Sequence, residues 1–398
     1  MQTNKKKISF IYFLGFISLG LIASFLGPSL PSFAENTQSS FKQISNLFIL
    51  SSIGYIIGSY AAGQILNKIQ GHRLLAFALF GIAILAAFLP LIQQLWVLIS
   101  IFLLLGVVQS VVDVSANTLL IWLHGSAVTN YMNGLHFFFG IGTLVAPIII
   151  AQSLKTRGNI NIGLWVIAAV ILVPAFLILK YPSPKEPQVN PEKVIDRPQI
   201  AATPLVIFLV IMFFGFTGAE ITFGNWIYTY SIGMKMADPQ NAAYLTSTFW
   251  GAFTLSRFLG IILAGKITAK QLMWINLIGC AVSILTLISF HQSQSFLWVG
   301  TFFFGFFIAN SFPTAMNLAE RMGVYSAKIT SLFFISSSIA VMVSPWVVGQ
   351  FFENTGPLVV LWAVFINICI AILVNALIQI YKRREIIPSR VLIDNKNV

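Results

Sequence analysis

Long apolar runs, separated by short polar stretches, make up most of the chain. Each run contains at least 18 residues with few charges, and a helix of that length, rising about 1.5 Å per residue, crosses a hydrocarbon core of about 30 Å. The pattern predicts an all-α membrane protein. Its twelve predicted transmembrane helices cover residues 8–30, 44–66, 74–92, 96–122, 131–152, 162–180, 204–230, 242–264, 271–290, 296–318, 328–350 and 357–381.

One polar segment, residues 181–203, is longer than the others. It contains five prolines among charged and amide residues, a composition that favours extended, solvated chain. We therefore predict three parts. Residues 1–180 form an N-terminal six-helix bundle, residues 181–203 a cytoplasmic linker, and residues 204–398 a C-terminal six-helix bundle with a short cytoplasmic tail.

The two halves have features of pseudo-repeats. Pro147 lies near the end of the fifth predicted helix and Pro345 near the end of the eleventh, while Gly106 in the fourth helix corresponds to Gly305 in the tenth. Parallel halves with helices interrupted by glycine and proline are typical of transporters, whose substrate site lies near the midplane between the halves. The sequence therefore favours a transporter over a channel or a receptor.

Basic residues are distributed unevenly across the predicted membrane. The net charge is +12, and of 23 Lys and Arg residues 18 fall on the side of the N-terminus, four on the other side and only Arg257 within a span. Cytoplasmic loops carry the excess of Lys and Arg. We therefore expect both termini in the cytoplasm, at the inner (plasma) membrane of a bacterium. The 18 residues are Lys5, Lys6, Lys7, Lys68, Arg73, Lys180, Lys185, Lys193, Arg197, Lys266, Lys270, Arg321, Lys328, Lys382, Arg383, Arg384, Arg390 and Lys396.

The first span has an alternative interpretation. Residues 5–7 are three lysines, and Ser32-Phe33-Ala34 has the small residues of a signal-peptide cleavage site. The apolar run is longer than in a usual signal peptide, and cleavage would leave eleven spans. The charge distribution favours twelve.

Composition excludes several classes of protein. The chain is 57% hydrophobic and 9% charged, whereas a soluble domain has about 25% charged residues. Its two cysteines lie in apolar runs and form neither a disulfide framework nor a metal site. Gly260 to Lys266 matches most of a phosphate-binding loop, but Ile267 replaces the required Ser or Thr. We expect no enzyme activity, nucleic-acid partner, metal or cofactor, apart from a coupling ion, H⁺ or Na⁺.

An acid in the fourth predicted helix is the main candidate for function. Gln109, Asp113 and Asn117 are spaced i, i+4, i+8 and lie on one helix face. A charge at the bilayer centre costs about 2.5 to 3.5 kcal/mol, so Asp113 is expected to face a wet interior. Burial favours its neutral form, so it can carry a proton, or it can stay ionised and hold Na⁺ with its neighbouring amides. The alternative is a structural carboxylate hydrogen-bonded between helices.

Three more charged residues are candidates for function. Glu220 lies sixteen residues into the seventh helix and is a second candidate for cation coupling. Arg257, in the eighth helix, is expected to pair with Glu320 as an inner gate, or to extend toward the lipid headgroups.

Amide, imidazole and aromatic side chains in the spans are suited to a polyhydroxylated substrate. Amides both donate and accept hydrogen bonds, His136 titrates near neutral pH, and tryptophan offers a flat apolar surface. The alternative roles are packing, interhelical hydrogen bonding and membrane-interface anchoring. The candidate substrate residues are Gln109, Asn117, Asn133, His136, Asn225, Trp226, Trp250, Asn310 and Asn317, with Trp226 preferred as the surface under a sugar ring.

The loop between the second and third predicted helices resembles the loop signature of the major facilitator superfamily. That signature has a glycine, then an acid and a base, then a glycine and two bases. Asn67 stands in the place of the acid, which weakens the charge relay that closes the cytoplasmic side in the family. The resemblance implies gating roles for Gly63, Asn67, Lys68, Gly71 and Arg73.

Six other stretches resemble one branch of this superfamily, which contains fucose, glucose and galactose proton symporters and the animal sodium-dependent glucose transporter. They are residues 25–31, 112–117, 131–137, 218–227, 249–257 and 312–320. The resemblance implies a monomer of twelve helices that works by alternating access on hexose-type substrates. Asp113 matches the helix-four acid that takes the proton in proton-coupled members. Some members also have an acid on helix one. The first predicted helix here has none, so either Glu220 shares the coupling task with Asp113 or coupling differs from that of these members.

The sequence thus predicts a cation-coupled importer of a small polar solute, first of all a hexose, embedded in the lipid bilayer. The alternative on the same fold is an exporter of amphipathic compounds, such as drugs or siderophores. The 36 phenylalanines are compatible with the wider, more aromatic pocket that an exporter would need.

Overall fold

The computed structural model describes residues 2–66, 68–186, 204–263, 266–324 and 326–394, and the ordered elements in these ranges are helices. In chain order they are α1 (Gln2–Ser24), α2 (Leu26–Asn36), α3 (Phe41–Ile44), α4 (Asn46–Ile65), α5 (Gly71–Phe88), η1 (Leu89–Leu91), α6 (Leu95–His124), η2 (Gly125–Ala127), α7 (Thr129–Arg157), α8 (Asn161–Ile178), α9 (Pro204–Gly233), α10 (Pro239–Leu263), α11 (Ala269–Ser289), α12 (Gln294–Ile308), α13 (Ser311–Arg321), α14 (Ala327–Thr355) and α15 (Val359–Asp394).

Eleven spans in the described part of the chain are long and apolar enough to cross a membrane, so this is a multi-pass integral membrane protein. The remaining predicted span, the eighth (residues 242–264), corresponds to α10, which has 25 residues but is not one of the eleven. Arg257 and several Ser and Thr residues make α10 more polar than its neighbours. The prediction of twelve helices therefore has eleven clear matches and one helix of adequate length but lower apolarity.

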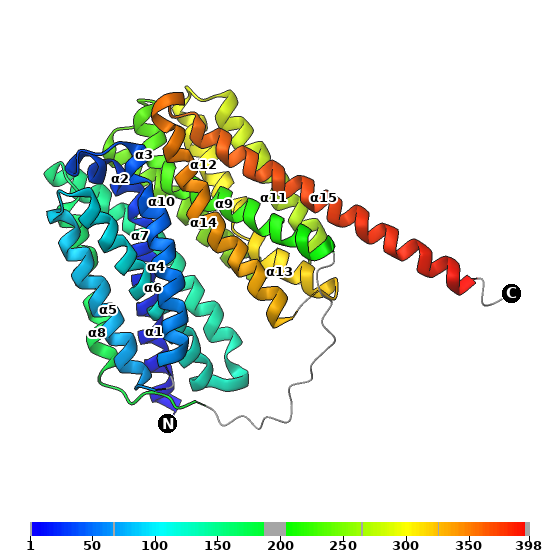
Figure 1. Cartoon of the computed structure of the whole chain (residues 1–398), viewed down its shortest axis with the longest axis horizontal. Coiled ribbons are helices and arrows are strands. Elements are labelled where there is room, and N and C mark those ends of the chain that lie inside the picture. Colours follow the sequence, from blue (N-terminus) through cyan, green and yellow to red (C-terminus); the bar gives the residue numbers. More distant parts are fainter. Residues whose placement is uncertain (1, 67, 187–203, 264–265, 325, 395–398) are drawn as a thin grey trace.

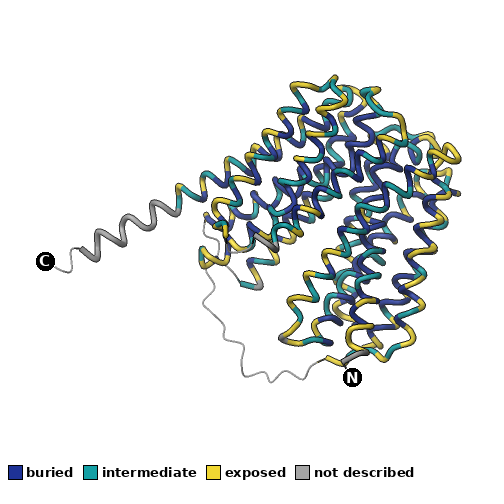
Figure 2. Tube along the Cα trace, turned by 180° about the vertical axis from the view of Figure 1, so that it is seen from behind, coloured by how far each residue is buried: buried dark blue, intermediate teal, exposed yellow. Residues whose placement is uncertain are grey.

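The helices form two groups, α1 to α8 and α9 to α15 (Figure 1). Buried residues lie on the inner faces of each group, and exposed residues lie mainly on the outside (Figure 2). The groups approach each other at one end, near α2 and α3, and diverge toward the end that carries the N-terminus. We call these the closed end and the linker end. Residues 187–203 of the predicted linker lie outside the described residues, so the predicted domain boundaries stay a prediction.

Two predicted spans are each broken by a proline. The first predicted span divides at Phe25 into α1 and α2, and the tenth divides at Ala309 and Asn310 into α12 and α13. Proline has no N–H and its ring clashes with the carbonyl four residues earlier. Pro28 therefore ends α1 at Ser24, and Pro313 acts on the carbonyl of Ala309.

Glycines let helices within the N-terminal half pack backbone to backbone. A Cβ at Gly54 of α4 would overlap the carbonyl oxygen of Leu103 in α6, and a Cβ at Gly106 would overlap the carbonyl oxygen of Ser51. Only glycine allows so close an approach. The helices α4 and α6 are thus held in fixed register, which determines what faces Asp113.

Candidate functional site

Asp113 is held by side chains from two helices. The hydroxyl of Tyr55, on α4, donates a hydrogen bond to Oδ2 of Asp113, and Nδ2 of Asn117 donates to Oδ1 at 2.7 Å. The same Nδ2 also donates to the backbone carbonyl of Asp113 at 2.9 Å. Both carboxylate oxygens therefore accept a hydrogen bond from a protein donor.

The backbone contact between α4 and α6 places Tyr55 against Asp113. Tyr55 follows Gly54, one of the glycines that let the two helices touch. Asp113 lies eighteen residues after Leu95, about 27 Å along α6, and is half-buried. Gln109 lies on the same face, one turn earlier, and is also half-buried. The i, i+4 spacing predicted the Asp113–Asn117 pair, and Tyr55 was missed because spacing within one helix does not identify the helix beside it.

A second group of ionisable residues has members in both halves. Glu220 of α9 and Arg257 of α10 interact electrostatically, and Arg257 also interacts with His136 of α7 in the other half. His136 is exposed and packs edge to face on Phe16, with ring centroids 5.8 Å apart. The structure therefore brings together three of the predicted residues, from both halves.

Arg257 does not reach Glu320, the partner expected for it. Its Nε donates to the carbonyl of Ala309 at 3.3 Å, and its guanidinium carbon lies 4.3 Å from the centroid of the Phe253 ring. Pro313 has no N–H to bond that carbonyl, and Arg257 supplies the donor instead. Glu320 is exposed, at the C-terminal end of α13. The expected inner-gate pair is therefore not formed here.

The candidate amides serve different roles. Asn310 donates to the backbone carbonyl and hydroxyl of Ser256, joining the break before α13 to α10. Asn225 is buried and donates to the carbonyl of Ile221 in its own helix. Asn317 is exposed and accepts a hydrogen bond from Arg321. Asn133 is exposed one turn before His136, so among these amides it is the best placed beside the second ionisable group.

Trp226 and Trp250 are almost fully buried. Trp226 is 0% exposed, donates to the carbonyl of Pro345 at 3.0 Å and stacks with Phe352. In this conformation it offers no surface to a sugar ring, because it lies in the contact between the halves. Trp250 is 4% exposed and packs on Phe249 and Phe253, and its indole N–H has no partner among the described residues.

Side chains from both halves cover the closed end. The ring of Phe41, in α3, packs on Trp226 and Phe352, and its backbone N–H donates to Glu353 at 2.8 Å. Further bonds join Trp346 to Asn46 and Gln350 to Ser45. This cluster has no signal in the sequence pattern, because α3 has only four residues and lies in a short polar stretch between spans.

The loop signature lies at the linker end, and its central histidine joins three segments. His72 is 3% exposed, and its Nδ1 lies 2.9 Å from the carbonyl oxygen of Tyr181, where the linker begins. A carbonyl only accepts, so Nδ1 donates and Nε2 accepts from the Tyr12 hydroxyl at 2.6 Å. In the loop signature, this position is only one of the two bases after the second glycine.

The remaining residues of the signature make few contacts. Gly63, Lys68 and Arg73 are exposed, and Gly71 is buried against Leu119 and Ser183. Asn67 lies outside the described residues.

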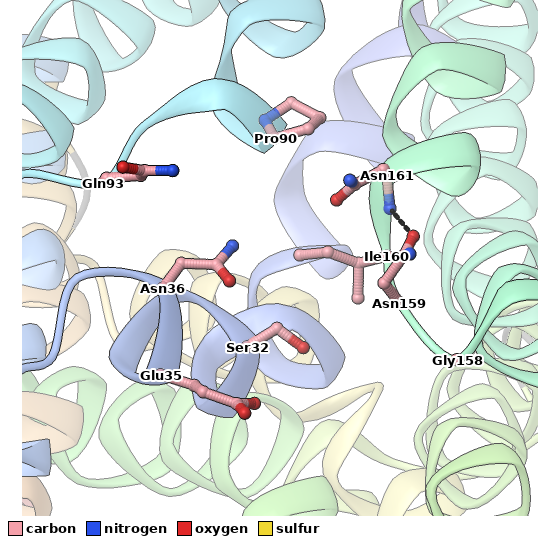
Figure 3. Close-up of a pocket in the computed structure, with 9 residues that line it drawn as sticks. All are labelled: Ser32, Glu35, Asn36, Pro90, Gln93, Gly158, Asn159, Ile160 and Asn161. Carbon is pink, nitrogen blue, oxygen red and sulfur yellow. Dashed lines mark hydrogen bonds between the residues drawn. The ribbon is translucent and has the colours of Figure 1, made fainter.

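A separate polar pocket of about 360 Å³ lies at the closed end of the N-terminal half (Figure 3). Asp113 lies about 27 Å along α6 from this end, so the pocket is separate from the Asp113 site. It lies between the end of α2, the η1 segment and the connection from α7 to α8. Its lining residues are Ser32, Glu35, Asn36, Pro90, Gln93, Gly158, Asn159, Ile160 and Asn161.

Known proteins resemble this chain over most of its length. Residues 10–345 match the family described as Major Facilitator Superfamily. Sodium-dependent glucose transporter 1 of Xenopus laevis is 26% identical over 351 residues, which cover 81% of this chain and 72% of that protein.

Two solved structures have the same fold, each with a TM-score of 0.72. A point mutant of the nucleoside transporter NupG is 13% identical, and the match covers 94% of this chain and 99% of that one. A bacterial homologue of the human lysosomal transporter Spinster, in an inward-facing and occupied conformation, is 12% identical, with 96% and 97% covered.

Proposed function

Because the chain belongs to the major facilitator superfamily and is a transporter rather than an enzyme, we propose that it imports a small polar solute, first of all a hexose, by cation-coupled alternating access. The observation that carries this proposal is the Asp113 site. A carboxylate deep in a membrane helix is costly, and here two donors hold it in one orientation. Such a group suits reversible binding of H⁺ or Na⁺.

The substrate class is supported by chemistry and by relatives. Asn133 and His136 offer hydrogen-bonding groups on an exposed face of α7, opposite Arg257 of the other half. Neutral hydroxyl groups suit such a mixed set of donors and acceptors. The frog relative is named as a glucose transporter. We assign Glu220 and Arg257 to the same pathway, because Arg257 interacts electrostatically with both Glu220 and His136.

Sidedness follows from the charges. Since Lys and Arg are concentrated at the linker end, we place both termini in the cytoplasm, with the plasma membrane of a bacterium as the expected location. The closed end then faces outward, and the conformation described is open toward the cytoplasm. Accumulation requires that cation and solute together change the relative stability of the two conformations. We expect the chain to do this as a monomer.

The test is uptake of labelled hexoses into proteoliposomes that contain the purified chain. A proton gradient and a sodium gradient are imposed separately, and protein-free vesicles are the control. We expect accumulation under one gradient. If no hexose enters under either gradient, the importer proposal fails, and amphipathic compounds become the next ligands to test.

A further inference from the structure

The two donors at Asp113 limit which cation can bind there. Oδ1 accepts from Asn117 and Oδ2 accepts from Tyr55. A metal ion binds lone pairs, and hard cations such as Na⁺ take oxygen ligands. Each carboxylate oxygen therefore has one lone pair engaged by a protein hydrogen atom, and a metal ion that ligates through these lone pairs must displace a donor.

The orientation of the Asn117 amide is determined by its backbone contact. Its nitrogen lies 2.9 Å from the carbonyl oxygen of Asp113, which can only accept a hydrogen bond. The NH₂ group must therefore face Asp113, and the amide oxygen points elsewhere. For Asn117 to ligate a metal ion together with Asp113, the amide would have to flip and break both of its hydrogen bonds.

A proton can bind without such a rearrangement. A tyrosine hydroxyl both donates and accepts. When Asp113 is ionised, the Tyr55 O–H donates to Oδ2. When a proton adds to Oδ2, the new O–H donates to the Tyr55 oxygen, whose own hydrogen turns away. One proton is taken up, the hydrogen bond between the Tyr55 oxygen and Oδ2 reverses its direction, and the same two side chains hold both forms.

We propose that Tyr55 is the residue that sets ion specificity at Asp113: by holding Oδ2 with its hydroxyl, it makes the site exchange a proton and excludes Na⁺. This rests on the proposed coupling role of Asp113. Tyr55 acts as a positioning residue, since it works through the carboxylate.

Other ionisable groups near α6 are engaged elsewhere. His72 of α5 and Tyr12 of α1 bind each other, and His136 of α7 lies with Arg257. His124, at the end of α6, bonds Ser9 of α1 and stacks on Tyr131 of α7. The basic residues on or beside the helices packed on α6 are exposed near the helix ends: Lys5, Lys6, Lys7, Lys68, Arg73, Lys155 and Arg157. Tyr55 is thus the titratable side chain that acts on Asp113.

The test reads the carboxylate directly and needs no transported solute. Infrared difference spectra of the purified full chain in nanodiscs follow the C=O stretch of the protonated acid as pH is changed. The band that belongs to Asp113 is the one lost in Asp113→Asn. Tyr55→Phe removes a donor that favours the ionised form, so the midpoint of this band should move up by about one pH unit. Tyr60→Phe, at a lipid-facing tyrosine of the same helix that is 75% exposed, should not move it.

Binding of radioactive Na⁺ to the unmodified chain is the second measurement. We expect no saturable binding that depends on Asp113. Saturable Na⁺ binding that disappears in Asp113→Asn would overturn the inference, and so would an unchanged midpoint in Tyr55→Phe. Either result leaves hexose uptake untouched as a test of the proposed function. Failure of hexose uptake, conversely, leaves the titration of Asp113 interpretable.

Discussion

Asp113 and Glu220 are both acids within membrane helices, but their surroundings differ. Two neutral donors hold Asp113, whereas Glu220 lies in the field of Arg257. A carboxylate held only by neutral donors keeps its charge uncompensated, so binding a cation there changes the net charge of the site. Glu220 and Arg257 together are already close to neutral. We therefore propose Asp113 as the main coupling residue, and Glu220 as a structural or substrate residue.

Replacing Asp113 with asparagine should separate accumulation from exchange. The amide keeps the size of the side chain but cannot take up a cation. We expect gradient-driven accumulation of labelled hexose to fall to the level of protein-free vesicles, while exchange of internal for external solute remains. Uptake and counterflow assays in proteoliposomes measure the two activities.

Glu186→Gln is the matched control for this prediction, because Glu186 is an exposed acid near the start of the linker. It should accumulate hexose as the unmodified chain does. Undiminished accumulation by Asp113→Asn would remove Asp113 from the coupling mechanism.

At the scale of residues, contacts within one helix were predictable and contacts between helices were not. The Asp113–Asn117 pair follows from a spacing of four residues on one helix. Tyr55 and the partner of Arg257 depend on which helices touch, and hydrophobic pattern carries no such information for helices apolar on all sides. Trp226 was expected at the substrate and lies in the closed end, because burial between the halves suits a large apolar ring equally well.

At the scale of elements, glycine and proline determine how the helices meet and where they break. Apolar runs predict where helices lie, but they do not show which helices touch, because lipid-facing and protein-facing positions are equally hydrophobic. Small residues are the better sign of contacts between helices. Gly54 and Gly106 carry that information for α4 and α6. The breaks at Pro28 and Pro313 could have been predicted from proline chemistry. Each proline lies within a continuous apolar run, which by itself predicts one unbroken helix.

Gly106→Ala should separate α4 from α6 and destabilise the protein. The added Cβ would overlap the carbonyl oxygen of Ser51, and backbone cannot yield as a flexible side chain does. Overpacking of this kind costs about 1 to 3 kcal/mol. Thermal unfolding of the purified chain should occur at a lower Tm.

Gly15→Ala is the control, since a Cβ at Gly15 of α1 would meet nothing within 4 Å. Alanine favours a helix over glycine, so this variant should match or exceed the parent in Tm. Equal Tm values for the two variants would contradict the close contact between α4 and α6.

His72→Ala should loosen the start of the linker. The change removes the bonds to Tyr181 and Tyr12, and it leaves the Tyr12 hydroxyl buried without its partner. An unsatisfied buried group of this kind costs about 1 to 3 kcal/mol. We expect a lower Tm and faster proteolysis in residues 181–186.

His72→Gln is the matched variant here, because its amide can still donate to the Tyr181 carbonyl. It should recover part of the lost stability. If the alanine variant is as stable and as protease-resistant as the parent, His72 does not hold the linker.

At the scale of the whole molecule, the two halves touch in two regions. They meet along α7 and α10, from Phe137 beside Phe258 to Gln152 bonded to Tyr244, and again at the closed end. Alternating access requires that the contacts between the halves at the closed end break while contacts between the halves at the linker end form. Proline, charge and repeat patterns predicted two halves. Which end is closed depends on contacts between the two halves. Sequence patterns within one half carry no information about those contacts.

Gly349 is the position where a small change should disturb this balance. A Cβ added there would overlap the Cβ of Ser45, across the contact between α14 and the end of α3. Gly349→Ala therefore destabilises the closed end without touching Asp113, and it should favour the conformation in which this end is open. Phe48 is 4% exposed, so a cysteine placed there in a chain lacking Cys280 and Cys369 should react slowly with a membrane-impermeant maleimide. Gly349→Ala should raise the labelling rate severalfold.

Ser45→Gly provides a compensating change, because it removes the side chain that the new methyl group meets and leaves only the Phe41 carbonyl oxygen, at 2.9 Å, close to it. The double variant should label more slowly than Gly349→Ala alone, which distinguishes a steric wedge from general loosening. Fast labelling that persists in the double variant would indicate damage elsewhere. Labelling that Gly349→Ala leaves unchanged would mean that the halves do not separate at this end, and alternating access would then have to operate through α7 and α10 alone.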